Sequence, residues 1–514
     1  MKKGRTFFAL RNAIVTGIVT FLNFPIQFIN RYFMVHYLGI TYLGLTSLFT
    51  NILSVLSLAD LGIGTSIVFL LYTPLAKKDF KKVAIIMGFY KKIYRIIAIV
   101  IFSLGLLVLP FLKNIVGKSI NYPHVYILFI IYLLGTVSSY LFSYNQSLLY
   151  ADQKNHIISW INLIVTYVML SIQVMTVIFF KNPLLYAALF VFSSFITNIV
   201  VSIFVNNIYH LERNDKIKEQ LSLREKNLFK HNIIGNMFLR VSGVVVTGTD
   251  NIFLSVFAGV TSVGLYANYV TLTNVIQRIM TQMIGAVTGS IGNYIAQKDE
   301  NENRKLFFNL QFINFMFDGM SCLGICFLSN DVITLWLGHK YIINNLDILL
   351  IALSFYIMNY RMLGWNFIAV YGLARYMKVF SINEMIANVL FTLVFLIIFK
   401  LKLTGILLGT IFSTLFTVTW QDPYVIFHHA FHKSCKEYFK KYIYNFLILV
   451  IEFCILYSIS CVLMNQITTR RHFILMTTFV VSISILIPYL FYINSSEIKY
   501  LKSIFNKILK REKI

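Results

Sequence analysis

The stretch NRYFMVHYLGITYLGLTSLFTNILSVLSLADLGIGTS, residues 30–66, joins the first two long apolar runs of the chain. It contains two charged residues that hydrocarbon excludes, Arg31 near the end of the first run and Asp60 inside the second. A charged side chain at the centre of a bilayer costs about 2.5–3.5 kcal/mol on insertion scales, so such residues usually face a polar interior. Gly62 and Gly64 follow Asp60 and would let a neighbouring helix approach closely. The stretch therefore predicts membrane-spanning helices around a polar interior.

Apolar runs of this kind recur along the whole chain of 514 residues, which is 58% hydrophobic and has a mean hydropathy of +0.74. Runs of about 20 apolar residues are typical of membrane-spanning helices, whereas a β-barrel would show alternating segments of about ten residues. We therefore expect an all-α, polytopic membrane protein with about 14 transmembrane helices. The expected spans are residues 8–36, 43–73, 88–112, 124–144, 157–180, 183–206, 231–258, 262–296, 306–328, 346–370, 375–400, 403–421, 442–464 and 471–493.

An internal repeat relates the two halves of the chain. Residues 38–45 (LGITYLGL) align without a gap with residues 258–265 (AGVTSVGL), and four of the eight positions are identical. The same shift of 220 residues also aligns a stripe of polar or small residues on one helix face of the first span with a similar stripe in the seventh span. These stripes are Thr16, Thr20, Asn23, Gln27 and Asn30, and Asn236, Arg240, Gly243, Thr247 and Asp250. Both copies start from the same side, so we expect a parallel repeat, a common plan among transporters.

The repeat predicts four parts, with two pseudo-symmetric six-helix bundles at the centre of the architecture. Residues 1–206 form the N-terminal bundle, 207–230 a cytoplasmic linker loop, 231–421 the C-terminal bundle, and 422–514 two extra transmembrane helices with a basic cytoplasmic tail. The net charge of +25 does not indicate nucleic-acid binding, because Lys and Arg concentrate in short loops and the tail, as the positive-inside rule produces. If both termini are cytoplasmic, only eight Lys and Arg residues lie in the expected outside segments: Lys113, Lys118, Lys181, Lys340, Lys400, Lys402, Arg470 and Arg471.

The combination of Arg31, Leu38-Gly39, Gly44-Leu45 and the run 58–62 (LADLG) resembles the polysaccharide transporter family, which contains flippases for O-antigen, capsule and exopolysaccharide. That family belongs to the multidrug/oligosaccharidyl-lipid/polysaccharide exporter superfamily, with the multidrug and toxin extrusion exporters and the lipid II flippase. The resemblance implies translocation of undecaprenyl-pyrophosphate-linked oligosaccharide units from the inner to the outer leaflet by alternating access. It also implies a bacterial cytoplasmic membrane. The implied partners are the lipid-linked oligosaccharide, membrane lipids, and the polysaccharide polymerase and glycosyltransferases of the same pathway, without nucleic acid.

Four arginines lie deep in the expected spans, and we expect them to form a cationic lumen that binds the substrate's pyrophosphate. Arginine presents a planar fork that suits phosphate oxygens and stays charged. The four are Arg31, Arg240, Arg278 and Arg361. The expected polar lining of the lumen is Asn23, Gln27, Asn30, Thr247, Asn274 and Gln282. The alternative for each arginine is pairing with one of five acids within the spans, which are Asp60, Asp250, Asp318, Glu384 and Glu452.

The sequence contains no Walker A motif, so transport would use an ion gradient or the membrane potential. We expect Asp60 or Asp250 to take part in coupling to H⁺ or Na⁺, with structural pairing as the alternative role. We expect no other cofactor, no metal site and no catalytic residue. The five cysteines have no metal-binding spacing, and small apolar fillers are their expected role.

Two alternative functions stay open. The first is an ion-coupled multidrug exporter of the same superfamily, which would favour acidic residues facing cationic drugs; the four arginines argue against it. The second is a polysaccharide polymerase-type membrane enzyme, which would need catalytic residues in a folded outside loop. The longest such loop, residues 329–345, has only Asp331 and His339. We therefore expect a transporter and not an enzyme.

Overall fold

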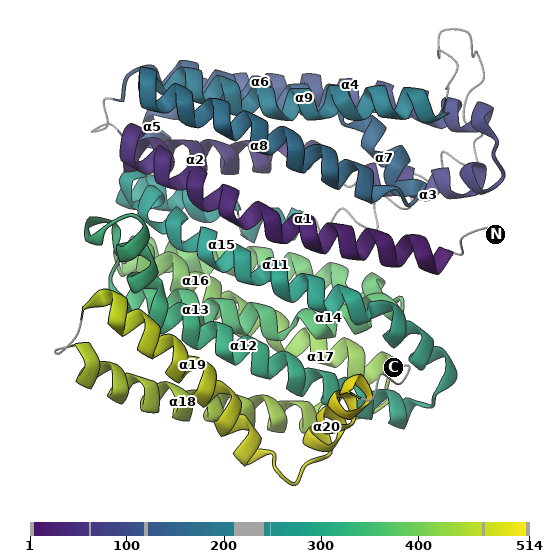
Figure 1. The fold of residues 1–514 in the computed structure, drawn as a ribbon, viewed down its shortest axis with the longest axis vertical. Helices are drawn as coiled ribbons and strands as arrows, with labels where there is room; N and C mark the ends of the chain where they lie inside the picture. Colours follow the sequence, from purple (N-terminus) through teal and green to yellow (C-terminus); the bar gives the residue numbers. More distant parts are fainter. Residues whose placement is uncertain are drawn as a thin grey trace. The chain divides into compact units, whose positions relative to one another are not determined.

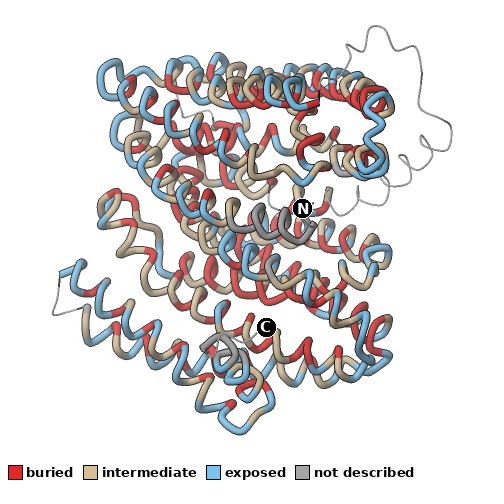
Figure 2. The backbone as a smooth tube through the Cα atoms, turned by 45° about the vertical axis from the view of Figure 1, so that its right-hand side comes forward, coloured by how far each residue is buried: buried red, intermediate tan, exposed pale blue. Residues whose placement is uncertain are grey.

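The computed structural model describes residues 5–60, 63–117, 122–209, 241–246, 248–464 and 468–509, and all statements below concern these residues. They are nearly all helical and contain no β-strand (Figure 1). Eleven helices among them are long and apolar enough to cross a membrane, so the all-α, polytopic membrane fold is confirmed. The chain divides into two compact units, residues 1–267 and 268–514. Figure 2 shows buried and exposed residues alternating along the helices of each unit.

The first unit is built from helices that cover the first seven predicted spans. They are α1 (Arg5–Phe33), α2 (Ile40–Leu56), α3 (Ile63–Ala76), α4 (Phe80–Val108), α5 (Leu112–Val116), α6 (Val125–Phe142), α7 (Tyr144–Ala151), α8 (Asn155–Phe180), α9 (Pro183–Tyr209) and the helical segment Val241–Ala258. The closest packing joins α6 to α9, α8 to α9, and α1 to α8. Phe49 of α2 and Phe129 of α6 pack edge to face in its apolar core, with ring centroids 5.3 Å apart.

The second unit begins within α11 (Val260–Gln297), which starts in the first unit. Its other helices are α12 (Glu300–Trp336), α13 (Asn345–Tyr360), α14 (Met362–Val370), α15 (Met377–Leu393), α16 (Leu403–Phe416), α17 (Val418–His429), α18 (Lys436–Met464), α19 (Thr469–Phe491) and α20 (Ser496–Leu509). Helix α12 packs against both α13 and α19, and α15 packs against α16. Helices α18 to α20, the yellow end of the chain in Figure 1, lie together at one edge of this unit.

Three of the predicted spans are broken where the sequence predicts continuous helices. The second is interrupted by a 3₁₀ turn, Ser57–Asp60, between α2 and α3. The tenth breaks at Arg361, between α13 and α14, and the twelfth at Thr417, between α16 and α17. Hydroxyl side chains contribute to such breaks by bonding backbone carbonyls. Ser57 Oγ donates to the Leu53 carbonyl (2.7 Å), and Thr417 Oγ1 donates to the Ser413 carbonyl (2.6 Å).

The local backbone repeats as the alignment of residues 38–45 with 258–265 predicts. Gly39 and Gly259 both take a positive φ, 88° and 84°, which only glycine adopts at little cost. The next residues, Ile40 and Val260, begin α2 and α11. Within the first unit, the two helix starts also contact each other reciprocally. A Cβ on Gly44 would lie 2.0 Å from the Val260 carbonyl oxygen, and a Cβ on Gly264 would lie 2.3 Å from the Ile40 carbonyl oxygen.

Helix α20 occupies the segment that the sequence analysis treats only as a basic tail. Ser495 Oγ caps it by accepting a hydrogen bond from the backbone N–H of Ile498 (3.3 Å). Glu497 is only 4% exposed and pairs with Lys441 of α18. Ile498 is 1% exposed, so one ion pair and an apolar contact together hold α20 against the unit.

We expect α20 to detach at acid pH. Burial alone would raise the pKa of Glu497, but the hydrogen bond and charge of Lys441 outweigh burial and hold this pKa below its ordinary value. A carboxyl group with a lowered pKa in the folded state stabilises the fold above its unfolded-state pKa, and this contribution is lost as pH falls through the lowered pKa. Hydrogen exchange in residues 496–509, corrected for its intrinsic pH dependence, should therefore accelerate on acidification.

The substitution Glu497→Gln should loosen α20 at neutral pH to about the level of the acidified wild type, and should remove most of this pH dependence. The matched control is Glu302→Gln, because Glu302 pairs with Lys305 (2.7 Å) on an exposed surface, where an ion pair contributes little. Protection of α20 in Glu497→Gln equal to that of the wild type would show that apolar contacts alone fix the helix.

Candidate functional site

A polar cavity of about 510 Å³ lies inside the first unit, between α2, α4, α6 and α9. Hydroxyl groups dominate its wall, together with aromatic rings and one carboxyl group. The polar and aromatic lining residues are Thr50, Ser54, Ser57, Asp60, Tyr94, Tyr132, Thr136, Ser139, Tyr140, Ser143, Phe190 and Ser194. A hydroxyl group can both donate and accept hydrogen bonds, so this wall can match either polarity of a bound hydroxyl group. This cavity could not be predicted from the sequence, because its hydroxyl residues are spread over four helices.

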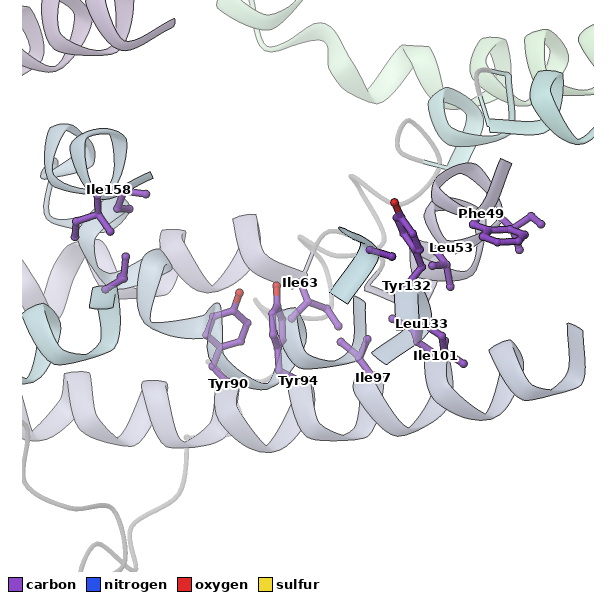
Figure 3. Packing of buried hydrophobic residues seen from close by; sticks show 14 of the residues in the cluster. Phe49, Leu53, Ile63, Tyr90, Tyr94, Ile97, Ile101, Tyr132, Leu133 and Ile158 are labelled. Carbon is purple, nitrogen blue, oxygen red and sulfur yellow. The ribbon is translucent and has the colours of Figure 1, made fainter. Parts of the chain in front are cut away.

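The helix break at Ser57–Asp60 places Asp60 in the wall of this cavity. Asp60 is 4% exposed, and Tyr90 and Tyr94 of α4 lie within electrostatic range of its carboxyl group. Figure 3 shows the two tyrosines side by side on α4, next to Ile63. Gly64 permits this approach, since a Cβ there would lie 3.2 and 3.3 Å from their hydroxyl oxygens.

Arg31 lies in the last turn of α1, and its side chain is half-buried near Tyr186 of α9. The neighbouring Asn30 accepts a hydrogen bond from the Tyr186 hydroxyl group. Nη1 of Arg31 is buried and has no hydrogen-bond partner, and no carboxylate in the described residues pairs with this guanidinium. A buried, uncompensated guanidinium is costly, so an anionic ligand would be stabilised here.

Arg278 lies on an exposed face of α11 together with Asn274 and Gln282. No ion pair joins Arg278 to another described residue. Such a polar face is not expected to lie against lipid, because charged and amide groups are costly in hydrocarbon. The structure therefore groups two of the expected lining residues and one of the four arginines on one helix face. Arg240 and Thr247 lie outside the described residues.

Arg361 takes the pairing alternative that the sequence left open. Its Nε donates to Asp422 Oδ2 (2.7 Å) and its Nη1 to Glu384 Oε1 (3.2 Å). Asp422 also accepts a hydrogen bond from Trp365 Nε1 (2.8 Å), and all three charged side chains are buried. The arginine at the α13–α14 break thus joins α15 and α17. Direct contact between Arg361 and the substrate stays a prediction. The two carboxyl groups already paired with Arg361 do not favour binding of an anion there.

The remaining candidates are dispersed over the first unit. Asn23 donates to the Val19 carbonyl (2.9 Å) within α1, and Gln27 is half-buried one turn later. Asp250, in the segment Val241–Ala258, is half-buried, and its Oδ1 has no hydrogen-bond partner. Asn30 and Arg31 are brought together beside Tyr186, whereas Asp60 lies in the hydroxyl-lined cavity. A role of Asp60 or Asp250 in ion coupling stays a prediction.

A second pocket, of about 650 Å³, lies in the second unit between α11, α12 and α20. Most of its wall is apolar. The apolar residues are Met280, Met283, Ile284, Val287, Ile291, Leu306, Leu310, Ile313, Phe317 and Leu363. Lys305, Tyr294 and Tyr500 form part of a polar rim. This pocket was also not predicted, since part of its rim comes from α20.

The fold is similar to solved structures of exporters and flippases. The lipid II flippase MurJ in an inward closed conformation is 15% identical, and the match covers 93% of this chain and 99% of that chain with a TM-score of 0.63. An inward-facing multidrug resistance MATE family transporter of the MOP superfamily is 12% identical, covering 80% of this chain and 98% of that one, with a TM-score of 0.60. A MOP superfamily transporter from Pyrococcus furiosus is 12% identical, covering 82% and 96%, with a TM-score of 0.53.

These likenesses show a fold shared with the exporter superfamily that residues 30–66 indicate. No curated protein sequence matches the chain. The family model described as "Polysaccharide biosynthesis protein" matches residues 9–288, more than half of the chain. The recognition based on the sequence is therefore confirmed, and the chain belongs to this polysaccharide biosynthesis protein family.

Proposed function

We propose that this protein is a flippase that moves undecaprenyl-pyrophosphate-linked oligosaccharide units from the inner to the outer leaflet for cell-surface polysaccharide synthesis. The observation that carries the proposal is the hydroxyl-lined cavity of the first unit. Its volume of about 510 Å³ falls in the range of about 300–1,000 Å³ of small-molecule sites. Membership of a polysaccharide biosynthesis family and a fold shared with a lipid II flippase support this reading.

The lining of the cavity suits a sugar. Hydroxyl groups such as those of Thr136 and Ser139 can exchange hydrogen bonds with sugar hydroxyl groups, and the rings of Tyr94 and Tyr132 can pack against the apolar C–H faces of a pyranose. A cationic drug would instead require several facing carboxylates, and Asp60 is the one acid among the described residues of this wall. The cavity therefore favours an oligosaccharide over a cationic drug.

Arg31 would hold the pyrophosphate, because its guanidinium is partly buried and lacks a carboxylate partner in the described part of the chain. A substrate-binding role of Arg278, on the exposed polar face of α11, stays a prediction. The polyprenyl chain would remain in apolar surroundings, so no chemical change of the substrate is needed. Alternating access would be driven by an ion gradient, with Asp60 and Asp250 as the coupling candidates.

The test is a leaflet assay in proteoliposomes with a fluorescent undecaprenyl-pyrophosphate oligosaccharide. Arg31→Ala should lower the flipping rate at least tenfold, because a charge-assisted contact to phosphate contributes about 1.5–3 kcal/mol. Arg375→Ala is the matched control, since Arg375 is exposed, donates to the neighbouring Tyr376 hydroxyl group (2.8 Å) and has no carboxylate partner among the described residues. Both variants remove one positive charge. A difference between their flipping rates therefore reports on the position of Arg31 and not on the net charge of the protein.

A second pair of variants tests the cavity itself. Ser138 and Ser139 are adjacent and half-buried on α6, and each donates to a backbone carbonyl, but only Ser139 lines the cavity. Ser139→Leu should therefore reduce flipping far more than Ser138→Leu at equal thermal stability. Equal flipping by both would contradict a role for the cavity. Export of a cationic dye without flipping would instead support a multidrug exporter.

A further inference from the structure

Two acidic side chains inside the second unit are buried more deeply than any candidate above. Asp318 of α12 is 0% exposed and Glu452 of α18 is 1% exposed. A third polar group, the hydroxyl group of Tyr356 on α13, is 0% exposed as well. None of the three belongs to the hydroxyl-lined cavity or the Arg361 cluster.

The side chains lie close together where α12 faces α13 and α18. A Cβ built on Gly319 would be 3.9 Å from Glu452 Oε2, so the Glu452 carboxyl group lies against α12 at the residue that follows Asp318. Cys322, one turn after Asp318, is within electrostatic range of both carboxyl groups. Tyr356 is within electrostatic range of Asp318 and Cys322. Helices α12, α13 and α18 thus place Asp318, Tyr356 and Glu452 around one buried region, with Cys322 in range of all three.

These groups have no hydrogen-bond partners among the residues that the structure describes. Both carboxyl oxygens of Asp318, the Glu452 Oε1 and the Tyr356 hydroxyl group are all buried and unpartnered. The neighbouring titratable groups are Tyr360 of α13, Tyr442 of α18, and Cys322 and Cys326 of α12, none of which is cationic. The nearby bases are engaged elsewhere, Arg361 with Asp422 and Glu384, and Lys441 with Glu497.

The same unit also contains a buried carboxyl group that is paired with a cation. Glu384 receives a hydrogen bond from Arg361 (3.2 Å), whereas Asp318 and Glu452 receive no comparable bond in the described residues. An isolated ionised carboxylate is too costly inside a protein, and the group takes up a proton instead. A bound metal cation would need several oxygen ligands, but two of the three atoms nearest to a Cβ on Gly319 are carbons of Leu449 and Phe315, and Glu452 Oε2 is the third.

We propose that Asp318 and Glu452 form a proton-binding site at the junction of α12, α13 and α18. In this conformation the site holds protons away from water, and the Tyr356 hydroxyl group is a third buried polar group beside it, without a hydrogen bond to either acid. Proton release requires water or a cation to reach the carboxyl groups, so it requires α18 to move away from α12. The site does not depend on the transported substrate, and its test does not use transport.

The test is infrared spectroscopy of the full-length protein in nanodiscs at neutral pH, followed in the carbonyl-stretch band of protonated carboxylic acids. The spectra of Asp318→Asn and of Glu452→Gln should each have less intensity in this band than the spectrum of the wild type. Glu384→Gln is the control and should keep the wild-type intensity there, because we expect the positive charge of Arg361 to favour the ionised form of Glu384. Tyr356→Phe keeps both acids and should shift the band in frequency without removing it.

Unchanged band intensity in both Asp318→Asn and Glu452→Gln would overturn the proposal, because the acids would then be ionised. Stabilisation of the wild type by Na⁺ or K⁺ that disappears in Asp318→Asn would also overturn it in favour of a metal-cation site. If Asp318→Asn does not fold, Glu452→Gln and Tyr356→Phe still decide between the outcomes, since each reports on the same band.

Discussion

Gly44→Ala and Gly264→Ala should each destabilise the protein by at least about 3 kcal/mol, the upper end of ordinary overpacking costs. The added methyl groups would lie 2.0 Å from the Val260 carbonyl oxygen and 2.3 Å from the Ile40 carbonyl oxygen, far inside van der Waals contact. Both obstructing atoms belong to the backbone at a helix start, so neither can turn aside like a side chain. The two starts of α2 and α11 would have to separate. We expect a large fall in the thermal midpoint or loss of folded protein.

The matched control for this effect is Gly285→Ala in the same helix as Gly264. A Cβ on Gly285 meets no described atom within 4 Å, and alanine is favoured over glycine in a helix by about 0.5–1 kcal/mol. Gly285→Ala should therefore be neutral or slightly stabilising. Thermal unfolding of the three purified variants measures the difference. A midpoint of Gly264→Ala near that of Gly285→Ala would show that α2 and α11 do not approach as closely as described here.

This reciprocal contact illustrates what the sequence could predict. The alignment of residues 38–45 with 258–265 indicated a repeat, because glycines recur where both copies need a positive φ and a close approach. Apolar runs likewise predicted the membrane helices, since their lengths follow from the thickness of a bilayer. Such features depend on local backbone geometry and on solvent. They can be predicted without knowing which helices become neighbours.

The partners of the buried charges could not be predicted in the same way. Arg361 and Asp422 are 61 positions apart, and their ion pair depends on how α14 and α17 pack. Arg31 looked equivalent to Arg361 in sequence, yet only Arg361 has carboxylate partners among the described residues. The breaks at Ser57 and Thr417 were missed because a hydrophobicity pattern does not register a hydroxyl group that bonds its own backbone.

Arg361→Met should destabilise the protein by about 3–5 kcal/mol, because it leaves Asp422 and Glu384 buried without a cation. Arg361→Lys should recover only part of this loss, since a lysine cannot reproduce the two-branched contact of the guanidinium. Arg304→Met is the control: Arg304 pairs with Glu437 at a partly exposed position, where an ion pair contributes about 0–1 kcal/mol. Thermal unfolding of purified protein measures all three.

The triple variant Arg361→Met/Glu384→Gln/Asp422→Asn separates the two roles considered for this arginine. It removes the buried charges together, and replacing a buried ion pair by neutral groups of similar volume is often close to neutral in stability. If Arg361 only joins α13, α15 and α17, the triple variant should regain both stability and flipping. Regained stability without flipping would show that the guanidinium contacts the substrate. Failure to regain stability would mean that the hydrogen bonds of the cluster, including that of Trp365, matter more than its charge balance.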